Sequence, residues 1–429
     1  MPGTDRAALV TGPASARREL RLLEVPPELE ARFARADAPP LILNGRLVDD
    51  ATLSTEERTY AVRVVSQSNS LLLCTPGDDE QGNCSLRLHT NASELMELVP
   101  TPARVERLGA LLGGGAEYAG EHAEGDARVQ RLYTPREVRS VVQASERELA
   151  EALRALHVVE LDGHLRRVEP AFLYAQLRVL LNQLDILACD ADKVPCAPVC
   201  AALEAAGPTR KEVAHAIVTD WFATTPAPTE GHVALATQDI ARFMGIQLLN
   251  ETRRMPLLAF MEQWRSMLGE AAHSEAKLPL LQGYYLLHPA PASFATSSVH
   301  ASVAEPEAGT LCAALSIQAF PHTGLSPVPA TRFQELFTVR SQWVLEELVP
   351  FLAPLTPPAE PGKKSSPLDA LLMKHARSFR GRWSRVHRAV LLEGAGPEAA
   401  AGGAGAGAPG KRTRQPDDCL LYQARVKYT

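Results

Sequence analysis

RFQELFTVRSQWVLEELVPFLAPL, residues 332–355, is the stretch that decides the expected fold. Its first half places Phe333, Leu336 and Phe337 on one helical face, and residues 345–352 form a second apolar face after a break. Apolar residues spaced three and four apart predict amphipathic helices on both sides of this break. The stretch therefore predicts a helical pair.

The residues around this stretch add helix boundaries and one strand. Thr338 lies at the break, where a threonine typically caps the following helix. Further on, Ser366, Pro367 and Asp369 occupy the N-cap, N1 and N3 positions of a third apolar segment. LLYQARVKY, residues 420–428, predicts a strand. Together these elements predict a winged helix, although an ordinary helical hairpin has the same helical spacing.

Charge is distributed unevenly along the 429 residues. The whole chain carries −6, but residues 363–429 contain thirteen Lys/Arg and five Asp/Glu, a local charge of +8. The other residues therefore carry −14. The negative total argues against a dedicated nucleic-acid binder, whereas an acidic body with a basic end is typical of an assembly subunit that contacts nucleic acid at one end.

Several functional classes are disfavoured by what the sequence lacks. The seven cysteines have no zinc-ligand spacing, so reduced thiols and no metal are expected. No apolar run approaches the length of a membrane span, which predicts a soluble intracellular protein. A phosphate-binding loop is absent, because Pro357 stands where its first glycine belongs. No motif of a hydrolase or dehydrogenase occurs, so we expect a non-enzymatic chain without a cofactor.

The N-terminal quarter predicts a β domain. After a disordered leader at residues 1–16, short apolar runs separated by glycine-containing turns occupy residues 17–112. Residues 59–65 alternate like a half-buried strand, and residues 70–74 have the pattern of a strand buried on both sides. Five or six short strands predict a small sandwich or half of a β-barrel, whose edges a single chain leaves open.

The clearest local structure follows a helix expected at residues 92–112 and a flexible linker at 113–132. Within residues 133–190, Thr134 to Glu137 and Ser145 to Glu148 are two capping boxes, each of which opens an amphipathic helix. An Asp-Gly turn then predicts a two-stranded hairpin. Residues 133–190 therefore predict the first winged helix.

The second helix of this segment has an outward face of mixed charge, made of Arg147, Glu151 and Arg154. Such a face has no net positive charge for phosphate groups, which favours a solvated or protein-contacting surface over a DNA-contacting one. We therefore assign these three residues to a protein contact.

Two further winged helices are predicted downstream. Residues 191–290 contain three amphipathic helices and a strand, and residues 291–316 are an Ala/Ser/Pro-rich loop. The third winged helix is expected at residues 317–429, with a Gly/Ala insertion at 394–410. The predicted fold class is therefore multidomain α+β, with an N-terminal β-barrel half followed by three winged-helix domains.

The basic C-terminal end is the predicted DNA-binding site. A helix continuing through residue 380 would place Lys374, Arg377 and Arg380 opposite its leucines, while His375 would lie with the core. The full set of predicted contacts is Lys374, Arg377, Arg380, Arg382, Arg385, Lys411, Arg412, Arg414, Arg425 and Lys427. Phosphate contacts of this kind need no particular base sequence. A solubilising face or a nuclear import signal has the same charge, so these alternatives remain open.

The order and spacing of several short motifs resemble one known family, that of the sister chromatid cohesion subunit Dcc of the cohesion-specific alternative replication factor C clamp loader. The C-terminal matches are Phe333-x-x-Leu336-Phe337-x-x-Arg340-x-x-Trp343, Leu348-x-Pro350-Phe351 and Ala370-Leu371-Leu372-x-Lys374. The upstream matches are Thr59-Tyr60, Ser68 to Leu73, Pro76-Gly77, Tyr133-Thr134 and Gln143 to Glu146.

This resemblance implies a function and a set of partners. The β domain would close by interlocking with a small β-barrel partner subunit and would clasp the C-terminal end of the large ATPase subunit. The chain would then tether the loader to single- and double-stranded DNA and to DNA polymerase epsilon in the nucleus. It would act indirectly on the sliding clamp, in clamp loading or unloading, and support cohesion. The alternative from the fold alone is a winged-helix transcription regulator.

Overall fold

The computed structural model describes residues 8–11, 20–78, 84–121, 131–225, 231–289, 315–356, 367–382 and 418–425, except 34, 36, 48, 115 and 208. It contains two compact units. The N-terminal unit comprises residues 1–117 and 127–167, and the C-terminal unit comprises residues 118–126 and 168–429. Both combine helices with small sheets, which confirms the α+β class, and the described strands form no closed barrel. No described helix is long and apolar enough to span a bilayer.

The N-terminal unit contains a five-stranded sheet of order β2-β8-β5-β4-β3. Its strands are β2 (Leu22–Glu24), β3 (Ile42–Asn44), β4 (Thr52–Ser54), β5 (Thr59–Ser66) and β8 (Glu94–Pro100). Helix α1 (Pro27–Phe33) packs on this sheet through Leu29, which shares a core with Leu53, Tyr60 and Leu98. The predicted helix at 92–112 is therefore wrong in its first half, where β8 pairs with β5.

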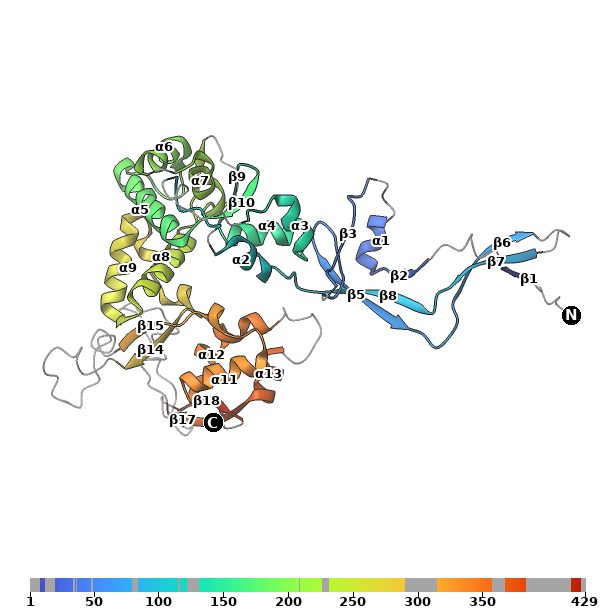
Figure 1. The fold of residues 1–429 in the computed structure, drawn as a ribbon. Coiled ribbons are helices and arrows are strands. Elements are labelled where there is room, and N and C mark those ends of the chain that lie inside the picture. Colours follow the sequence, from blue (N-terminus) through green and yellow to red (C-terminus); the bar gives the residue numbers. More distant parts are fainter. Residues whose placement is uncertain are drawn as a thin grey trace, which may run out of the picture. The chain divides into compact units, whose positions relative to one another are not determined.

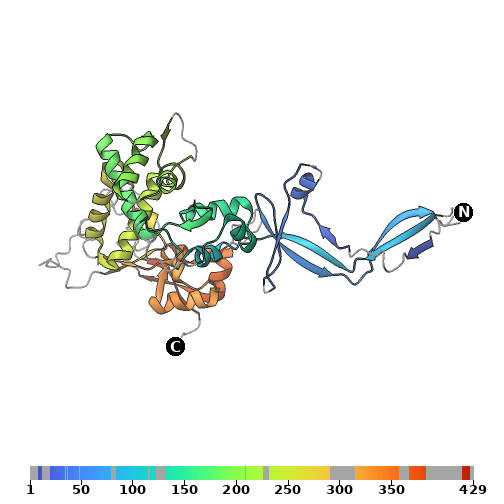
Figure 2. The same cartoon turned by 45° about the horizontal axis from the view of Figure 1, so that its top comes forward.

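A second, three-stranded sheet has the order β1-β7-β6. It consists of β1 (Ala8–Thr11), β6 (Leu72–Asp78) and β7 (Cys84–Asn91), so part of the expected disordered leader is a strand. Figures 1 and 2 show β5 and β8 continuing into β6 and β7 as one long two-stranded ribbon. Two backbone hydrogen bonds bridge the join, from Gln67 to Ser93 (2.9 Å) and from Ala92 to Leu71 (2.7 Å). We call residues 59–78 and 84–100 the ribbon.

The helical part of the N-terminal unit follows the sequence prediction closely. It contains α2 (Glu106–Leu112), α3 (Pro135–Val141), α4 (Glu146–Ala155), β9 (Val158–Leu161) and β10 (His164–Arg167). Both predicted capping boxes are present, at Thr134 and at Ser145. The hairpin turns at Asp162 and Gly163, which both have positive φ, as a two-residue turn between twisted strands requires.

One order of elements recurs four times in the part of the chain that the structure describes. Each copy, which we call a module, has a helix, a short strand position, one or more helices and two strand positions. Module 1 comprises α2 to β10, with Tyr133 bridged to Leu165 as its first strand position. In every copy the last strand position pairs with both others and therefore lies in the middle.

Modules 2 and 3 begin the C-terminal unit. Module 2 contains α5 (Pro170–Leu187), β11 (Val194–Pro195), α6 (Cys196–Ala206), α7 (Lys211–Ala216), a π-helical turn (Ile217–Trp221) and β12 (His232–Val233). Its second strand position is Ala223, which is bridged to Leu235 just after β12. Module 3 contains α8 (Thr237–Thr252), β13 (Arg254–Pro256), α9 (Leu257–Ala272), β14 (Tyr285–Pro289) and β15 (Leu315–Ala319), with 3-10 turns at His273–Glu275 and Leu278–Leu281. Two elements differ from the predicted boundaries. Helix α5, expected with residues 133–190, packs on α6, α8 and α9, while β15 completes the sheet of module 3.

Module 4 contains the stretch at residues 332–355. Its elements are α11 (Pro329–Val339), β16 (Gln342–Val344), α12 (Leu345–Leu352), α13 (Pro367–His375), β17 (Ala376–Arg382) and β18 (Asp418–Ala424), with 3-10 turns at His322–Gly324 and Ala353–Leu355. Phe333, Trp343 and Phe351 are fully buried in its core. The predicted cap at Thr338 is wrong, because α11 continues through this residue and its hydroxyl donates to Gln334 O (2.7 Å). The predicted strand at β18 is confirmed.

Candidate partner and nucleic-acid interfaces

The far half of the ribbon has apolar side chains but no core. Val64, Leu71 and Leu72 are 53%, 43% and 44% exposed, and Ser85 is the only buried residue among the described side chains of β6 and β7. The prediction that residues 70–74 are buried on both sides is therefore wrong for the chain alone. An apolar strand pair without a covering layer is unstable in water and is typical of a surface that another chain covers.

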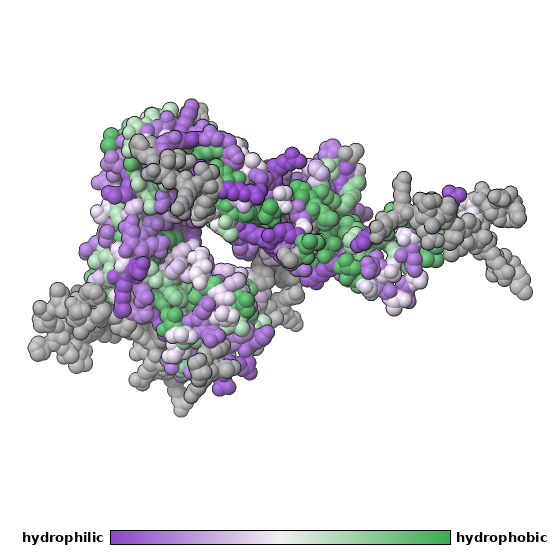
Figure 3. Space-filling view, viewed as in Figure 1, coloured by the Kyte–Doolittle hydropathy of each residue, from purple (hydrophilic) through white to green (hydrophobic). Residues whose placement is uncertain are grey.

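Apolar side chains are also exposed on the near part of the same unit. Figure 3 shows hydrophobic residues gathered over α1, β3 and β5, where Phe33 and Leu43 are 51% and 67% exposed. Strand β3 pairs only with β4, so one edge of the five-stranded sheet has no partner among the described strands. Apolar residues next to an open sheet edge favour strand addition from another chain.

Polar contacts join this sheet to module 1. The buried Gln143 side chain donates to Asn44 O (3.2 Å) and to Asp50 O (2.8 Å), and Asn44 donates to Arg139 O (3.1 Å). Glu148, which completes the capping box of Ser145, also accepts a hydrogen bond from the Thr59 hydroxyl (2.6 Å). These contacts give Thr59 and Gln143, both in segments singled out in the sequence, a structural role.

The three predicted protein-contact residues lie on one exposed face of α4. Arg147 and Glu151 form an ion pair one turn apart (2.9 Å) with side chains 65% and 64% exposed, and Arg154 is also exposed. Exposed pairs of this kind contribute only about 0.3–0.5 kcal/mol to stability. The mixed charge of the face is thus confirmed, while its protein contact stays a prediction.

A half-buried histidine, His157, lies between α4 and the hairpin of module 1. Burial of the His157 imidazole, with a smaller effect of the charge on Arg167, lowers its pKa to about 4. Between about pH 6.5 and about pH 4 the unfolded chain therefore binds a proton at this histidine, whereas the folded chain does not.

We expect the free energy of unfolding of the N-terminal unit to fall on the order of 2 kcal/mol between pH 7 and pH 5 because of this histidine. Urea titrations at both pH values measure the loss. His157→Asn suits the control because asparagine tolerates the positive φ of 54°. The variant should lose clearly less stability over the same pH range; an equal loss in both proteins would show that other groups cause it.

The basic end is arranged differently from the prediction. Helix α13 ends at His375, so only Lys374 of the three residues lies on the helix, where it is exposed. Arg377 and Arg380 are exposed on the following strand, β17. Residues three apart on a strand point to opposite faces, so the single helical face predicted for Lys374, Arg377 and Arg380 is wrong. His375 stacks on Phe333 with ring centroids 5.0 Å apart, and burial lowers its pKa. His375 is half-buried and therefore lies at the edge of the core to which it was assigned.

The other predicted DNA contacts are described only in part. Arg425 follows β18, and its backbone N–H and guanidinium donate to His375 O and Met373 O. Arg382 ends β17. Arg385, Lys411, Arg412, Arg414 and Lys427 lie outside the described residues. DNA binding by this set stays a prediction.

Two arginines in module 4, one partly buried and one fully buried, have structural partners. The side chain of Arg340 forms an ion pair with Glu347 (2.5 Å), and the two side chains are 15% and 3% exposed. Arg340 also donates to Leu287 O of β14 (2.6 Å) and lies over the Trp343 ring, which links modules 3 and 4. Arg332, 4% exposed, donates to four backbone carbonyls. Its acceptors are Ser326 (2.7 Å), Phe351 (2.8 Å), Leu325 (3.0 Å) and His322 (3.4 Å).

The described residues show no metal cluster, and burial disfavours ionisation of two of their thiols. No group of three His, Cys, Asp or Glu side chains among them could hold a metal ion. Cys196 and Cys200 lie on α6, where burial raises the pKa of Cys200 to about 11 and so disfavours a reactive thiolate.

Comparison with known proteins identifies the family. Residues 20–352 match the family model described as sister chromatid cohesion protein Dcc1, which covers well over half of the chain. The chain belongs to the Dcc1 family. Sister chromatid cohesion protein DCC1 of Xenopus tropicalis is 25% identical over 351 residues, spanning 79% of this chain and 81% of its own. The proteins of that name from Mus musculus and Homo sapiens are 25% and 24% identical, spanning 86% and 85% of this chain and 87% of each of theirs.

Membership in Dcc1 places the chain in a family of sister chromatid cohesion proteins, and this name denotes no catalytic activity. The Dcc1 match includes the ribbon and modules 1 to 3. It ends at Leu352, so the predicted DNA contacts from Lys374 onward all lie after it.

Proposed function

We propose that the chain is a non-catalytic subunit of the alternative replication factor C clamp loader that supports sister chromatid cohesion, acting in the nucleus during DNA replication. The observation that carries this proposal is the exposed apolar far half of the ribbon, which one chain alone leaves without a core. Such a surface belongs in an assembly, and the family to which the chain belongs is one of cohesion proteins.

In this proposal the ribbon and its sheets are half of a β-barrel. The small β-barrel partner subunit supplies the missing strands, and the C-terminal end of the large ATPase subunit is held beside them. Among the described strands β6 pairs only with β7, which leaves its other edge open to strand addition. The apolar side chains of Leu71 and Leu72 would supply the buried contacts.

The modules are proposed to be winged helices with divided tasks. Support comes from the order helix, strand, helix, two strands, with the last strand in the middle. The mixed-charge face of α4, with Arg147, Glu151 and Arg154, would contact DNA polymerase epsilon. The basic end would contact single- and double-stranded DNA through phosphates without sequence preference. Docked in this way, the loader would act on the sliding clamp, in clamp loading or unloading.

The proposal predicts that Leu72→Asp combined with Leu73→Asp prevents capture of the small partner subunit. Burying two carboxylates in an apolar interface should weaken binding at least about 30-fold, the effect of losing one interface hot spot of about 2 kcal/mol. Co-expression of the full chain with the partner, followed by affinity purification and mass spectrometry, measures this loss.

Ile186→Asp is the matched control, because Ile186 is 64% exposed and lies in the other unit. It should leave capture intact. Undiminished capture by the Leu72/Leu73 variant would refute the ribbon as the partner interface. The transcription-regulator alternative instead predicts a chain that binds one duplex sequence strongly over a scrambled one.

A further inference from the structure

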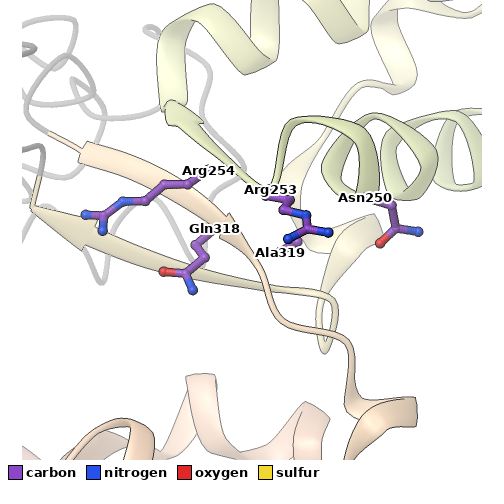
Figure 4. A pocket seen from close by; sticks show the side chains of 5 residues that line it. All are labelled: Asn250, Arg253, Arg254, Gln318 and Ala319. Carbon is purple, nitrogen blue, oxygen red and sulfur yellow. The ribbon is translucent and has the colours of Figure 1, made fainter.

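Module 3 contains a pocket of about 450 Å³ whose lining is rich in hydrogen-bond donors. Its walls are formed by Asn250, Arg253, Arg254, Gln318 and Ala319. Figure 4 shows Asn250 and Arg253 side by side at the end of α8, while Arg254 and Gln318 extend from the paired strands β13 and β15. The side chain of Arg253 lies on the Asn250 side of the pocket, whereas that of Arg254 extends the other way, beyond Gln318 (Figure 4). Two guanidinium groups and two carboxamides thus line one surface, contributed by segments more than sixty residues apart in sequence.

The pocket has no carboxylate in its lining. Arg254 donates to the Ser316 hydroxyl (3.2 Å), and neither Arg253 nor Arg254 forms an ion pair with a described residue. The C-terminal end of α8 contributes roughly half a negative charge, which the two guanidinium charges exceed. The pocket is therefore electropositive.

In module 4 the arginine at the position that corresponds to Arg253 is neutralised by a carboxylate of the same module. Arg340 directly follows the first helix of module 4, as Arg253 follows that of module 3. Arg340 pairs with Glu347, the third residue of α12, whereas the third residue of α9 is Ala259. In module 3, Arg253 is therefore exposed, and the position of the acidic partner is occupied by Ala259.

The backbone at Arg253 is strained. Its φ of 57° and ψ of −50° lie in a region that residues with a side chain rarely occupy. A glycine would adopt this conformation at lower cost, yet an arginine stands here. Strain of this kind is concentrated at functional sites, where the side chain is needed.

We propose that Arg253 and Arg254 at this pocket each bind one of two neighbouring phosphate groups of the DNA backbone and so give the chain a second DNA contact, separate from the basic end. A guanidinium presents several donors in a planar fork that matches phosphate oxygens, and carboxamides add neutral donors. This inference rests on the proposed DNA-binding function. Unlike the basic end, all five lining residues lie inside the segment that matches the Dcc1 family model.

The test measures the affinity of the full chain, bound to its partner subunit, for a random-sequence duplex at several salt concentrations. Arg253→Gln with Arg254→Gln should reduce the slope of log K against log salt by about 1.8, since each phosphate contact contributes about 0.9. Arg178→Gln with Lys211→Gln removes the same charge from exposed positions of the same unit and should leave the slope nearly unchanged. Melting temperatures of both variants check that they fold.

The basic-end variant Lys374→Ala, Arg377→Ala, Arg380→Ala separates the two hypotheses. A reduced slope for the pocket variant, beyond that of the charge-matched control, supports the pocket. An unchanged slope for the pocket variant, with a reduced slope for the basic-end variant, overturns the pocket and leaves the proposed DNA contact intact. If the unmodified complex does not bind the duplex at all, both the DNA-binding function and the pocket are overturned. If the pocket variant misfolds, Arg253→Gln alone serves as the test, with an expected slope change of about 0.9.

Discussion

Replacement of Arg340 by methionine should lower the free energy of unfolding of the C-terminal unit by about 3–5 kcal/mol. The guanidinium neutralises Glu347, whose side chain is only 3% exposed, and binds Leu287 O of the neighbouring module. Its removal leaves a buried carboxylate without its cation and a carbonyl without this donor. Urea unfolding of the full chain, followed by tryptophan fluorescence, measures the loss because Trp343 lies beneath Arg340.

Two further variants test the cause of this loss. Arg147→Met removes the arginine of an ion pair that is exposed, and it should cost less than about 0.5 kcal/mol. Combining Arg340→Met with Glu347→Leu removes both charges and should recover much of the lost stability. If the double variant is no more stable than Arg340→Met alone, lost packing rather than an unpaired charge explains the effect.

The second large effect is expected at Arg332. Arg332→Met should destabilise the C-terminal unit by about 3 kcal/mol or more, because the buried carbonyls that accept from its guanidinium lose their donor, and each unsatisfied group costs about 1–3 kcal/mol. The same urea titration measures it. Arg178→Met, on the exposed face of α5, is the control and should change stability by no more than about 0.5 kcal/mol. A small loss for Arg332→Met would mean that water replaces the guanidinium.

Local signals in the sequence predicted module 1 well. The two capping boxes and the Asp-Gly turn are specified by residues three or fewer apart, and each is present in the structure. Segments whose secondary structure depends on pairing with a strand far away in sequence were predicted less well. Residues 94–100 have apolar spacing compatible with a helix, and only pairing with β5 makes them a strand. Likewise, β17 begins where a helix was expected, because β18 supplies its hydrogen-bond partners.

The candidate interfaces show the same limit. Mixed charge on the face of α4 could be predicted because Arg147, Glu151 and Arg154 follow one another at intervals of about one helical turn. The buried pattern of residues 70–74 was assigned correctly to a strand, but a sequence pattern does not say which chain covers it. The pocket of module 3 could not be predicted, since Arg253 and Gln318 become neighbours only through the pairing of β13 with β15.

The central position of β18 also determines when module 4 can fold. Strands β16 and β17 both pair with β18, which follows β17 by 35 residues in sequence. During synthesis the ribosome therefore releases both flanking strands before the strand that joins them. Until residues 418–424 emerge, β16 and β17 expose unpaired edges, a state that is prone to aggregation and to chaperone binding. The sheet of module 4 can therefore form only late in synthesis, whereas all strands of modules 1 to 3 have been synthesised much earlier.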